Sequence, residues 1–257
     1  MSKRKRVVKA VQETSSFNGL ANKFDANIYG TTKGDLRHRL LLHYLHPYLQ
    51  QPSLRVLDAG GGTGYMTLEF AQQGHNIHLV DVSDDVLNVA RERLQAFPNA
   101  VVEQNDVLTI TQQYDVVLCH AVLEWLAHPL QYIKHLLSLL PSGGMLSLSF
   151  FNQNAKVFNN LLYGNFDYVN EGMPVKNTVR LNPHNAQDPE QILQFIGSLP
   201  GVEIIMSAGI RCIHDYMSDK QKISQHYDLL FAAECEYGVK TPYKWLGKYF
   251  YVQVKKH

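Results

Sequence analysis

The sequence predicts an α/β fold with a mostly parallel sheet that is covered by helices on both faces. Between residues 54 and 152, short apolar segments alternate with segments of helical periodicity, as in repeated strand–helix–strand units. The apolar segments are nearly continuous, which is typical of strands buried on both faces. Glycines directly follow the first of these strands, where such a fold turns sharply and approaches a ligand.

Each element of this alternating part has a local signal. The first strand ends at the glycines, and Gly74 stops the short helix that follows. Ser83 is placed to cap the next helix, and Pro98 ends it. The expected helices are 35–50, 66–74, 84–97 and 129–140, and the expected strands are 54–60, 76–83, 100–106, 114–120 and 145–152.

The pattern changes after residue 152. Residues 153–188 are rich in asparagine and contain glycine, proline and aromatic residues, so we expect an inserted segment over the sheet. The elements expected after it are a helix at 189–198, a strand at 202–210, a helix at 218–236 and a last strand near 247–255. We therefore expect a single domain over residues 17–257, preceded by a basic, disordered leader at 1–16.

Composition excludes several classes of protein. With 45% hydrophobic and 18% charged residues the chain is globular, and no apolar run is long enough to span a membrane. No apolar segment follows the basic N-terminus, which argues against a secretory signal. Cys119, Cys212 and Cys235 are too far apart for a disulfide framework or a zinc ribbon, which favours a cytoplasmic setting.

Charge is unevenly distributed along the chain. Five of the 24 Lys and Arg residues lie in residues 1–9, so the rest of the chain has 19 bases against 23 acids. Such a body is a poor non-specific binder of nucleic acid, because that binding scales with the number of phosphates neutralised. A local basic patch stays compatible with this composition.

The most informative segment is the glycine turn VLDAGGGTG at 56–64. Tyr65 and Thr67 stand where the dinucleotide fingerprint needs its last glycine, and no Gly-Lys-Ser/Thr follows for a phosphate loop. The turn instead resembles the first motif of class I S-adenosylmethionine-dependent methyltransferases. The motif positions are Asp58, Gly60, Gly62 and Gly64.

Polar residues also end the next three strands. Asp81 is suited to accept hydrogen bonds from both hydroxyls of a ribose, although an acid there also serves as a helix cap. Asn105 and Asp106 fit either a contact to an adenine amino group or a simple turn. His120 ends the fourth strand on the expected ligand face, where a structural histidine is the alternative.

Several segments together resemble the bacterial tRNA 5-carboxymethoxyuridine methyltransferase family. They are NIYGTTKGDLR (27–37), VLDAGGGTG (56–64), HAVLEWL (120–126), GNFDYV (164–169), GMP (172–174) and RCIHDY (211–216). The resemblance runs from about Phe17 to the C-terminus. It implies a Rossmann-like sheet of seven strands, with one antiparallel strand near the C-terminus.

The resemblance also implies S-adenosyl-L-methionine as cofactor, the anticodon region of tRNA as partner, and no metal. Arg37 is the residue expected to bind the methionine carboxylate, as a forked donor. The other cofactor residues that it implies are Gly60, Gly61, Asp81, Gln104, Asn105 and His120.

The substrate of this family carries its own nucleophile. A carboxylate is ionised at neutral pH, so its attack on a methyl group needs no general base, and we expect none. A cation must hold this carboxylate, with Arg211 as first candidate and Lys33 as second. Tyr29, Phe166 and Tyr168 are expected to stack on the flipped uracil, although core packing is the alternative for each.

Two other functions stay open at this level. One is O-methylation of a small or carrier-bound carboxylate, such as a malonyl thioester, which would use the same cofactor site. The other is a non-catalytic cofactor-binding partner of an RNA enzyme, against which the intact glycine turn and its acids argue.

Overall fold

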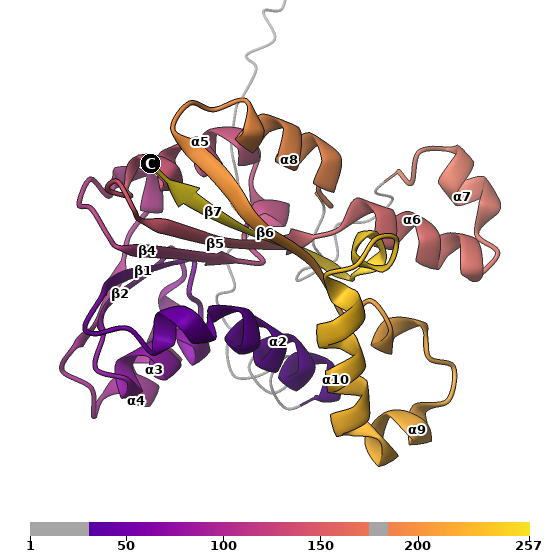
Figure 1. Ribbon diagram of the computed structural model, residues 1–257, viewed down its shortest axis with the longest axis horizontal. Coiled ribbons are helices and arrows are strands. Elements are labelled where there is room, and N and C mark those ends of the chain that lie inside the picture. Colours follow the sequence, from indigo (N-terminus) through magenta and orange to yellow (C-terminus); the bar gives the residue numbers. More distant parts are fainter. Residues whose placement is uncertain (1–30, 175–184) are drawn as a thin grey trace, which may run out of the picture.

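A seven-stranded sheet forms the centre of the protein in the computed structural model, which describes residues 31–174 and 185–257 (Figure 1). The strand order is β3-β2-β1-β4-β5-β7-β6, and β7 alone runs antiparallel to its neighbours. The fold class and the antiparallel strand near the C-terminus are therefore confirmed. The strands are β1 (Arg55–Ala59), β2 (Asn76–Asp81), β3 (Ala100–Gln104), β4 (Val116–His120), β5 (Met145–Phe151), β6 (Val202–Ile210) and β7 (Tyr249–Lys256).

Helices cover both faces of this sheet. Helices α5 and α8 pack on one face, and α2, α3, α4 and α10 pack on the other (Figure 1). The longer helices are α2 (Thr32–Leu49), α3 (Tyr65–Gln72), α4 (Asp84–Leu94), α5 (Pro129–Ser138), α6 (Gln153–Leu162), α8 (Pro189–Gly197) and α10 (Tyr227–Gly238). The shorter ones are α7 (Phe166–Asn170), α9 (Lys220–Gln225), η1 (Val107–Thr109), η2 (Leu123–Trp125), η3 (His214–Tyr216) and η4 (Tyr243–Leu246).

The apolar pattern of each element explains its place. Every residue of β5 is buried, as expected of a strand with helices on both sides. Helix α2 turns Leu36, Leu40 and Leu41 toward the sheet and is capped by Thr31, whose side chain accepts a hydrogen bond from Gly34 N.

Three local expectations were wrong. The helix expected at 218–236 is two helices, because the chain leaves helical geometry at His226. Helix α4 ends at Leu94, three residues before the predicted end, and Ser83 occupies its N-cap position without a capping hydrogen bond from its side chain. The backbone N–H of Ser83 instead donates to Asp81 Oδ1 at 2.9 Å.

The inserted segment leaves the sheet after β5. Its described part contains α6 and α7, which project away from the sheet beyond the carboxyl end of β5 (Figure 1). Phe158 ties α6 to η3 through an edge contact with Tyr216, at 5.3 Å between ring centroids. The expected leader and Tyr29 lie outside the described residues.

The carboxyl ends of the parallel strands and the beginning of β7 lie at one edge of the sheet. Because β7 is antiparallel, its first residue Tyr249 pairs with Phe151, the last residue of β5. Folds of this kind bind ligands at this edge. It therefore brings Asp58, Asp81 and His120 to the same region as the residues that precede β7.

Candidate functional site

The glycine turn joins β1 to α3 at the binding edge of the sheet. Gly62 has a φ of 57°, a conformation that glycine adopts without steric cost, and its Cα faces open space. At Gly61 a Cβ atom would lie 2.7 Å from Asp58 Cγ, so the turn sits directly on this carboxyl group. The backbone is thus exposed to a ligand on one side and packed on the other.

Asp58 stabilises the glycine turn from the buried side. Its carboxylate is 3% exposed, and Oδ2 accepts a hydrogen bond of 2.6 Å from the Thr67 hydroxyl of α3. Burial raises the pKa of Asp58 to about 6, against the hydrogen bonds from Thr67. In this structure Asp58 therefore holds strand, turn and helix together.

Asp81 is connected to the same turn. Its Oδ2 accepts from Gly62 N at 3.1 Å and its Oδ1 from Ser83 N at 2.9 Å. A carboxylate accepts about four hydrogen bonds, so beside its backbone donors Asp81 keeps acceptor capacity for a ribose hydroxyl. Burial raises the pKa of Asp81, and the three backbone N–H groups around it oppose this shift.

The residues after β3 form a hydrogen-bonded turn. Asn105 Oδ1 accepts from Asp106 N at 2.8 Å, and Asp106 Oδ1 accepts from Leu108 N at the start of η1. The exposed Gln104 donates to Val82 O at 3.2 Å. This geometry matches the turn interpretation of Asn105 and Asp106, and the turn lies beside Asp81, since Asn105 N donates to Asp81 O.

His120 belongs to a buried chain of polar side chains. Its Nε2 lies 2.8 Å from Ser147 Oγ, which lies 3.0 Å from the Tyr251 hydroxyl. Gln253 donates to that hydroxyl and to Tyr44 O of α2. Burial, with the charges of Arg37 and His38, lowers the pKa of His120 to about 3, so the ring is neutral.

The ring of Tyr249 lies close to both arginines that the sequence singled out. Arg37 of α2 is buried, with Cζ 5.1 Å from the centre of the Tyr249 ring, and Arg211 Cζ lies 5.7 Å from the same ring. Arg211 also donates to the backbone carbonyl oxygen of Lys33 at 3.3 Å, so the two residues predicted as substrate cations are neighbours. They stand next to Arg37, the predicted ligand of the cofactor carboxylate.

Arg211 already has an acidic partner, Asp215. Nε and Nη2 of Arg211 donate to the two carboxylate oxygens at 3.0 and 2.7 Å. Burial opposes ionisation of Asp215, but the hydrogen bond from His214 and the charge of Arg211 outweigh it and hold the pKa of Asp215 well below its usual range. The pair is therefore neutral overall.

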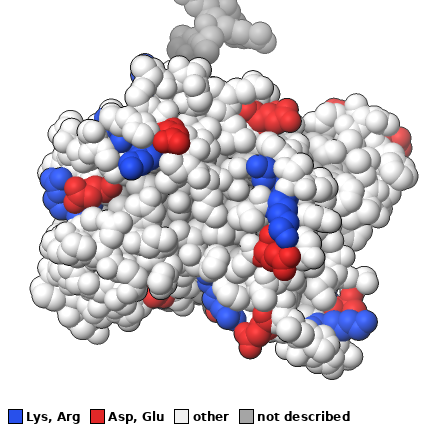
Figure 2. Space-filling view, viewed as in Figure 1, with Lys and Arg blue, Asp and Glu red and all other residues white. Residues whose placement is uncertain are grey.

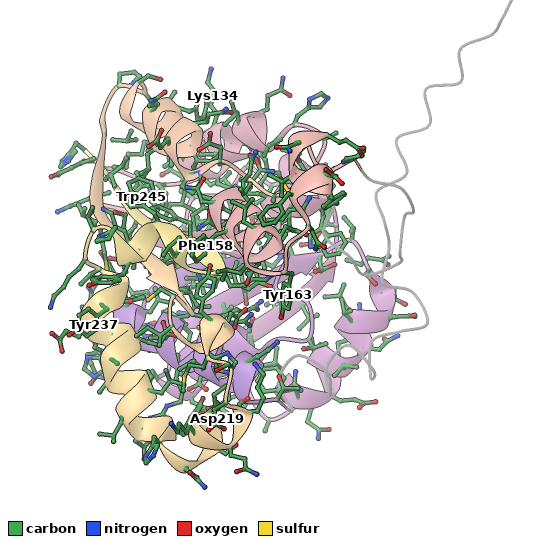
Figure 3. The ribbon with its side chains drawn as sticks, turned by 90° about the vertical axis from the view of Figure 1, so that its right-hand side faces the viewer. Lys134, Phe158, Tyr163, Asp219, Tyr237 and Trp245 are labelled. Atoms are coloured by element: carbon green, nitrogen blue, oxygen red, sulfur yellow. The ribbon has the colours of Figure 1, made fainter. Side chains whose placement is uncertain are left out.

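The predicted aromatic contacts lie on a separate element. Phe166 is 58% exposed and Tyr168 is half-buried, and both belong to α7, away from the glycine turn (Figure 1). Figure 3 faces this side of the molecule, with Phe158 between Trp245 and Tyr163. Tyr163, which the sequence analysis did not single out, is 82% exposed at the end of α6.

Glu124 and Glu234 are buried acids that the sequence analysis missed. Glu124 follows β4, its Oε2 has no hydrogen-bond partner among the described residues, and burial raises its pKa to about 7. Glu234 of α10 accepts hydrogen bonds from the backbone of Cys212, Ile213 and His214. Glu124 lies in the HAVLEWL segment, a signal that could have identified it, whereas no local signal marked Glu234.

The described residues hold no cluster of His, Cys, Asp and Glu suited to a metal, and within the same ranges no helix is long and apolar enough to cross a membrane. Acidic and basic side chains are intermingled on the face shown in Figure 2, without a continuous basic stripe. The donors and acceptors at the sheet edge fit an adenosyl amino acid. A glycine backbone, a carboxylate with remaining acceptor capacity and a buried arginine lie at this edge.

Comparisons with known proteins agree with this geometry. The model of a family described as "Methyltransferase domain" matches residues 32–197. The tRNA 5-carboxymethoxyuridine methyltransferase of Escherichia coli K12 is 36% identical over 94% of this chain and 96% of its own length. A malonyl-[acyl-carrier protein] O-methyltransferase of Bacillus cereus is 28% identical over 63% of this chain and 59% of its own length.

Solved structures show the same fold. The magnesium protoporphyrin IX methyltransferase of Synechocystis PCC 6803, solved with bound SAH, superimposes with a TM-score of 0.63 at 18% identity. The match covers 94% of this chain and 96% of that one. With the near full-length similarity to the E. coli enzyme, the chain belongs to the class I methyltransferases and, within them, to the tRNA 5-carboxymethoxyuridine methyltransferase family.

Proposed function

We propose that this protein transfers a methyl group from S-adenosyl-L-methionine to the carboxylate of 5-carboxymethoxyuridine at the wobble position of tRNA. The product is the methyl ester. The observation that carries this proposal is the 36% identity over 94% of the chain, which extends through the inserted segment and the C-terminal strands. A tRNA substrate agrees with the cytoplasmic setting that the sequence favours.

The cofactor site is built from the strand ends. Asp81 accepts from the ribose with its remaining acceptor capacity, and the glycine turn provides a backbone surface for the rest of the molecule. Arg37 binds the cofactor carboxylate as a forked donor. Gln104, Asn105 and Asp106 border the adenine, and His120 lies near the sheet edge between this site and Tyr251.

When bound, the cofactor supplies a methyl group on a sulfonium, which passes to a carboxylate oxygen as the carbon–sulfur bond breaks and sulfur keeps the electron pair. No proton is transferred, and this agrees with the side chains of the site. His120 has a pKa of about 3 and is a very weak base. Asp58 is engaged by Thr67. The protein would therefore act by alignment, holding the attacking oxygen in line with the sulfonium methyl group.

Arg211 and Lys33 contribute to the substrate side of the site. After its bonds to Asp215 and Lys33 O, the guanidinium of Arg211 keeps two N–H groups for a substrate oxygen. We assign base stacking to the aromatic residues of the inserted segment and the N-terminal segment. These are Tyr29, Phe166 and Tyr168, whose exposure is compatible with RNA contact where the structure describes it.

One experiment separates this function from the alternatives. Purified enzyme is incubated with labelled cofactor and tRNA from cells that lack the methyl ester, and nucleosides are analysed by mass spectrometry. We expect label in 5-carboxymethoxyuridine methyl ester and none on tRNA with unmodified uridine. Label in an acyl-carrier fraction alone would favour the malonyl alternative, and no label in either fraction would favour a non-catalytic partner.

A further inference from the structure

We propose that the ammonium group of Lys248 supplies the positive charge that binds the substrate carboxylate. The inference rests on the proposed function and adds a substrate-binding residue to it. Lys248 immediately precedes β7, at the same edge of the sheet as the cofactor site. Neither the motifs nor the resemblance pointed to it.

The backbone of Lys248 is fixed on both sides. Its N–H donates to Arg211 O at 3.4 Å, and its carbonyl oxygen accepts from Asn152 N at 3.2 Å. The side chain is half-buried, with Nζ 4.6 Å from the centre of the Phe151 ring. Phe151 is the last residue of β5, so the ammonium group lies at the carboxyl end of a central strand.

The charges around Lys248 do not balance. Burial lowers its pKa, and the charges of Arg211, Lys33 and Lys156 lower it further, while only Asp215 acts in the opposite direction. Asp215 is already bound to Arg211 and His214. Within residues 31–174 and 185–257, Lys248 Nζ has no hydrogen-bond or ion-pair partner, so the group has an excess of positive charge.

A bound anion would neutralise this excess of positive charge. A partly desolvated lysine without a counterion is unfavourable, and a carboxylate in contact with it forms a charge-assisted hydrogen bond. The neutral Arg211–Asp215 pair orients such a carboxylate but cannot balance its charge. Lys33 is exposed, whereas Lys248 combines partial burial, a fixed backbone and an unpartnered ammonium group.

The position of Lys248 also suits the reaction. Tyr249, the next residue, has its ring close to both Arg37 and Arg211. Arg37 is the proposed ligand of the cofactor carboxylate, so Lys248 is adjacent in sequence to a residue that contacts the cofactor side of the site. One lysine contacts one carboxylate oxygen and leaves the second oxygen free for attack.

The test compares binding of two tRNAs that differ only by the carboxylate group of the modified base. One carries 5-carboxymethoxyuridine and the other neutral 5-methoxyuridine, and affinities are measured with S-adenosylhomocysteine present to prevent turnover. We expect the wild type to prefer the carboxylate, Lys248→Met to lose at least about tenfold of this preference, and Lys248→Arg to keep it. Lys156→Met removes another of the positive charges around Lys248, so it is the matched control and should keep the preference for the carboxylate.

Two outcomes overturn the inference. If Lys248→Met weakens the binding of both tRNAs equally, Lys248 binds a phosphate. If it changes the affinity for neither tRNA, the ammonium group has no contact with the substrate. Melting temperatures of the variants show whether they are folded, and Lys248→Arg gives a second measurement if Lys248→Met is not. Wild-type turnover on the first tRNA, measured in parallel with S-adenosyl-L-methionine, tests the proposed function separately.

Discussion

Arg211 and Asp215 form a two-point ion pair in which both carboxylate oxygens lie within 3.0 Å of guanidinium nitrogens. The pair is buried, and Arg211 adopts a φ of 61°, which is unusual for a residue with a side chain. Glu234 holds the following turn by accepting three backbone N–H groups. The guanidinium is thus held in one fixed orientation.

We expect Arg211→Met to reduce methyl transfer to tRNA by at least about tenfold, because charge-assisted hydrogen bonds contribute roughly 1.5–3 kcal/mol each. Cofactor affinity, measured by calorimetry, should stay within about twofold. Lys33→Met should act in the same direction but more weakly, since its side chain is exposed. An Arg211→Met enzyme with normal turnover would remove Arg211 from the substrate site.

The same ion pair predicts an acid-dependent stability. The pKa of Asp215 is lower in the folded protein than the usual value of about 4, so its contribution is present above about pH 4 and is lost as the pH falls below it. In Arg211→Met the folded pKa rises, so less stability is lost between pH 5 and pH 3. Urea unfolding across this range measures the difference.

The control for this measurement is Arg91→Met. Arg91 pairs with Asp84 on the exposed surface of α4, at 3.0 Å. Exposed ion pairs contribute little to the free energy of unfolding, so the stability of this variant should follow that of the wild type at every pH. Equal pH dependence in the wild type and Arg211→Met would contradict the assignment of the acid-sensitive step to Asp215.

Asp81→Ala should weaken the binding of S-adenosyl-L-methionine by at least about tenfold, because two ribose hydroxyls lose their acceptor. The glycine turn loses the bond from Gly62 N in the same variant, so Asp81→Asn is needed as a milder change. Asp84→Ala, an exposed acid three residues later, is the matched control. Calorimetry that shows the same affinity for Asp81→Ala and Asp84→Ala would exclude Asp81 from the cofactor site.

The rate of methyl transfer in a single turnover should be nearly flat from about pH 6 to 8, because the nucleophile is already ionised. His120→Gln can lower this rate through the contact with Ser147 but should not change its pH dependence, since His120 stays neutral throughout. Glu124, with a pKa of about 7, does titrate between pH 6 and 8. The variant Glu124→Gln removes this titration, so any pH dependence that remains has another source. A tenfold rise per pH unit in Glu124→Gln would indicate a general base.

The strands could be predicted from the sequence because both faces of each central strand are buried, which produces runs such as VVLCH and MLSLSFF. The glycine turn and Asp81 were predictable for a related reason: their positions follow from strand ends. The break at His226 was missed, since the apolar pattern continues from α9 into α10.

The substrate side of the site was harder to predict. Glu234 of α10 meets the turn after β6 by accepting from the backbone of Cys212, Ile213 and His214, and no short motif records this contact. Lys248 reaches the site only because β7 lies between β5 and β6. Residues that depend on such long-range pairing have no local pattern.

The position of β7 also has a consequence for synthesis on the ribosome. Strand β7 follows β5 and β6 in the sequence but lies between them in the sheet, so β5 and β6 cannot obtain their shared neighbour until β7 leaves the exit tunnel. At about 5–20 residues per second, the edge of β5 stays unpaired for several seconds after it emerges. During that time the nascent chain exposes the unpaired edge of a strand that is fully buried in the folded protein, and this edge needs shielding from other chains.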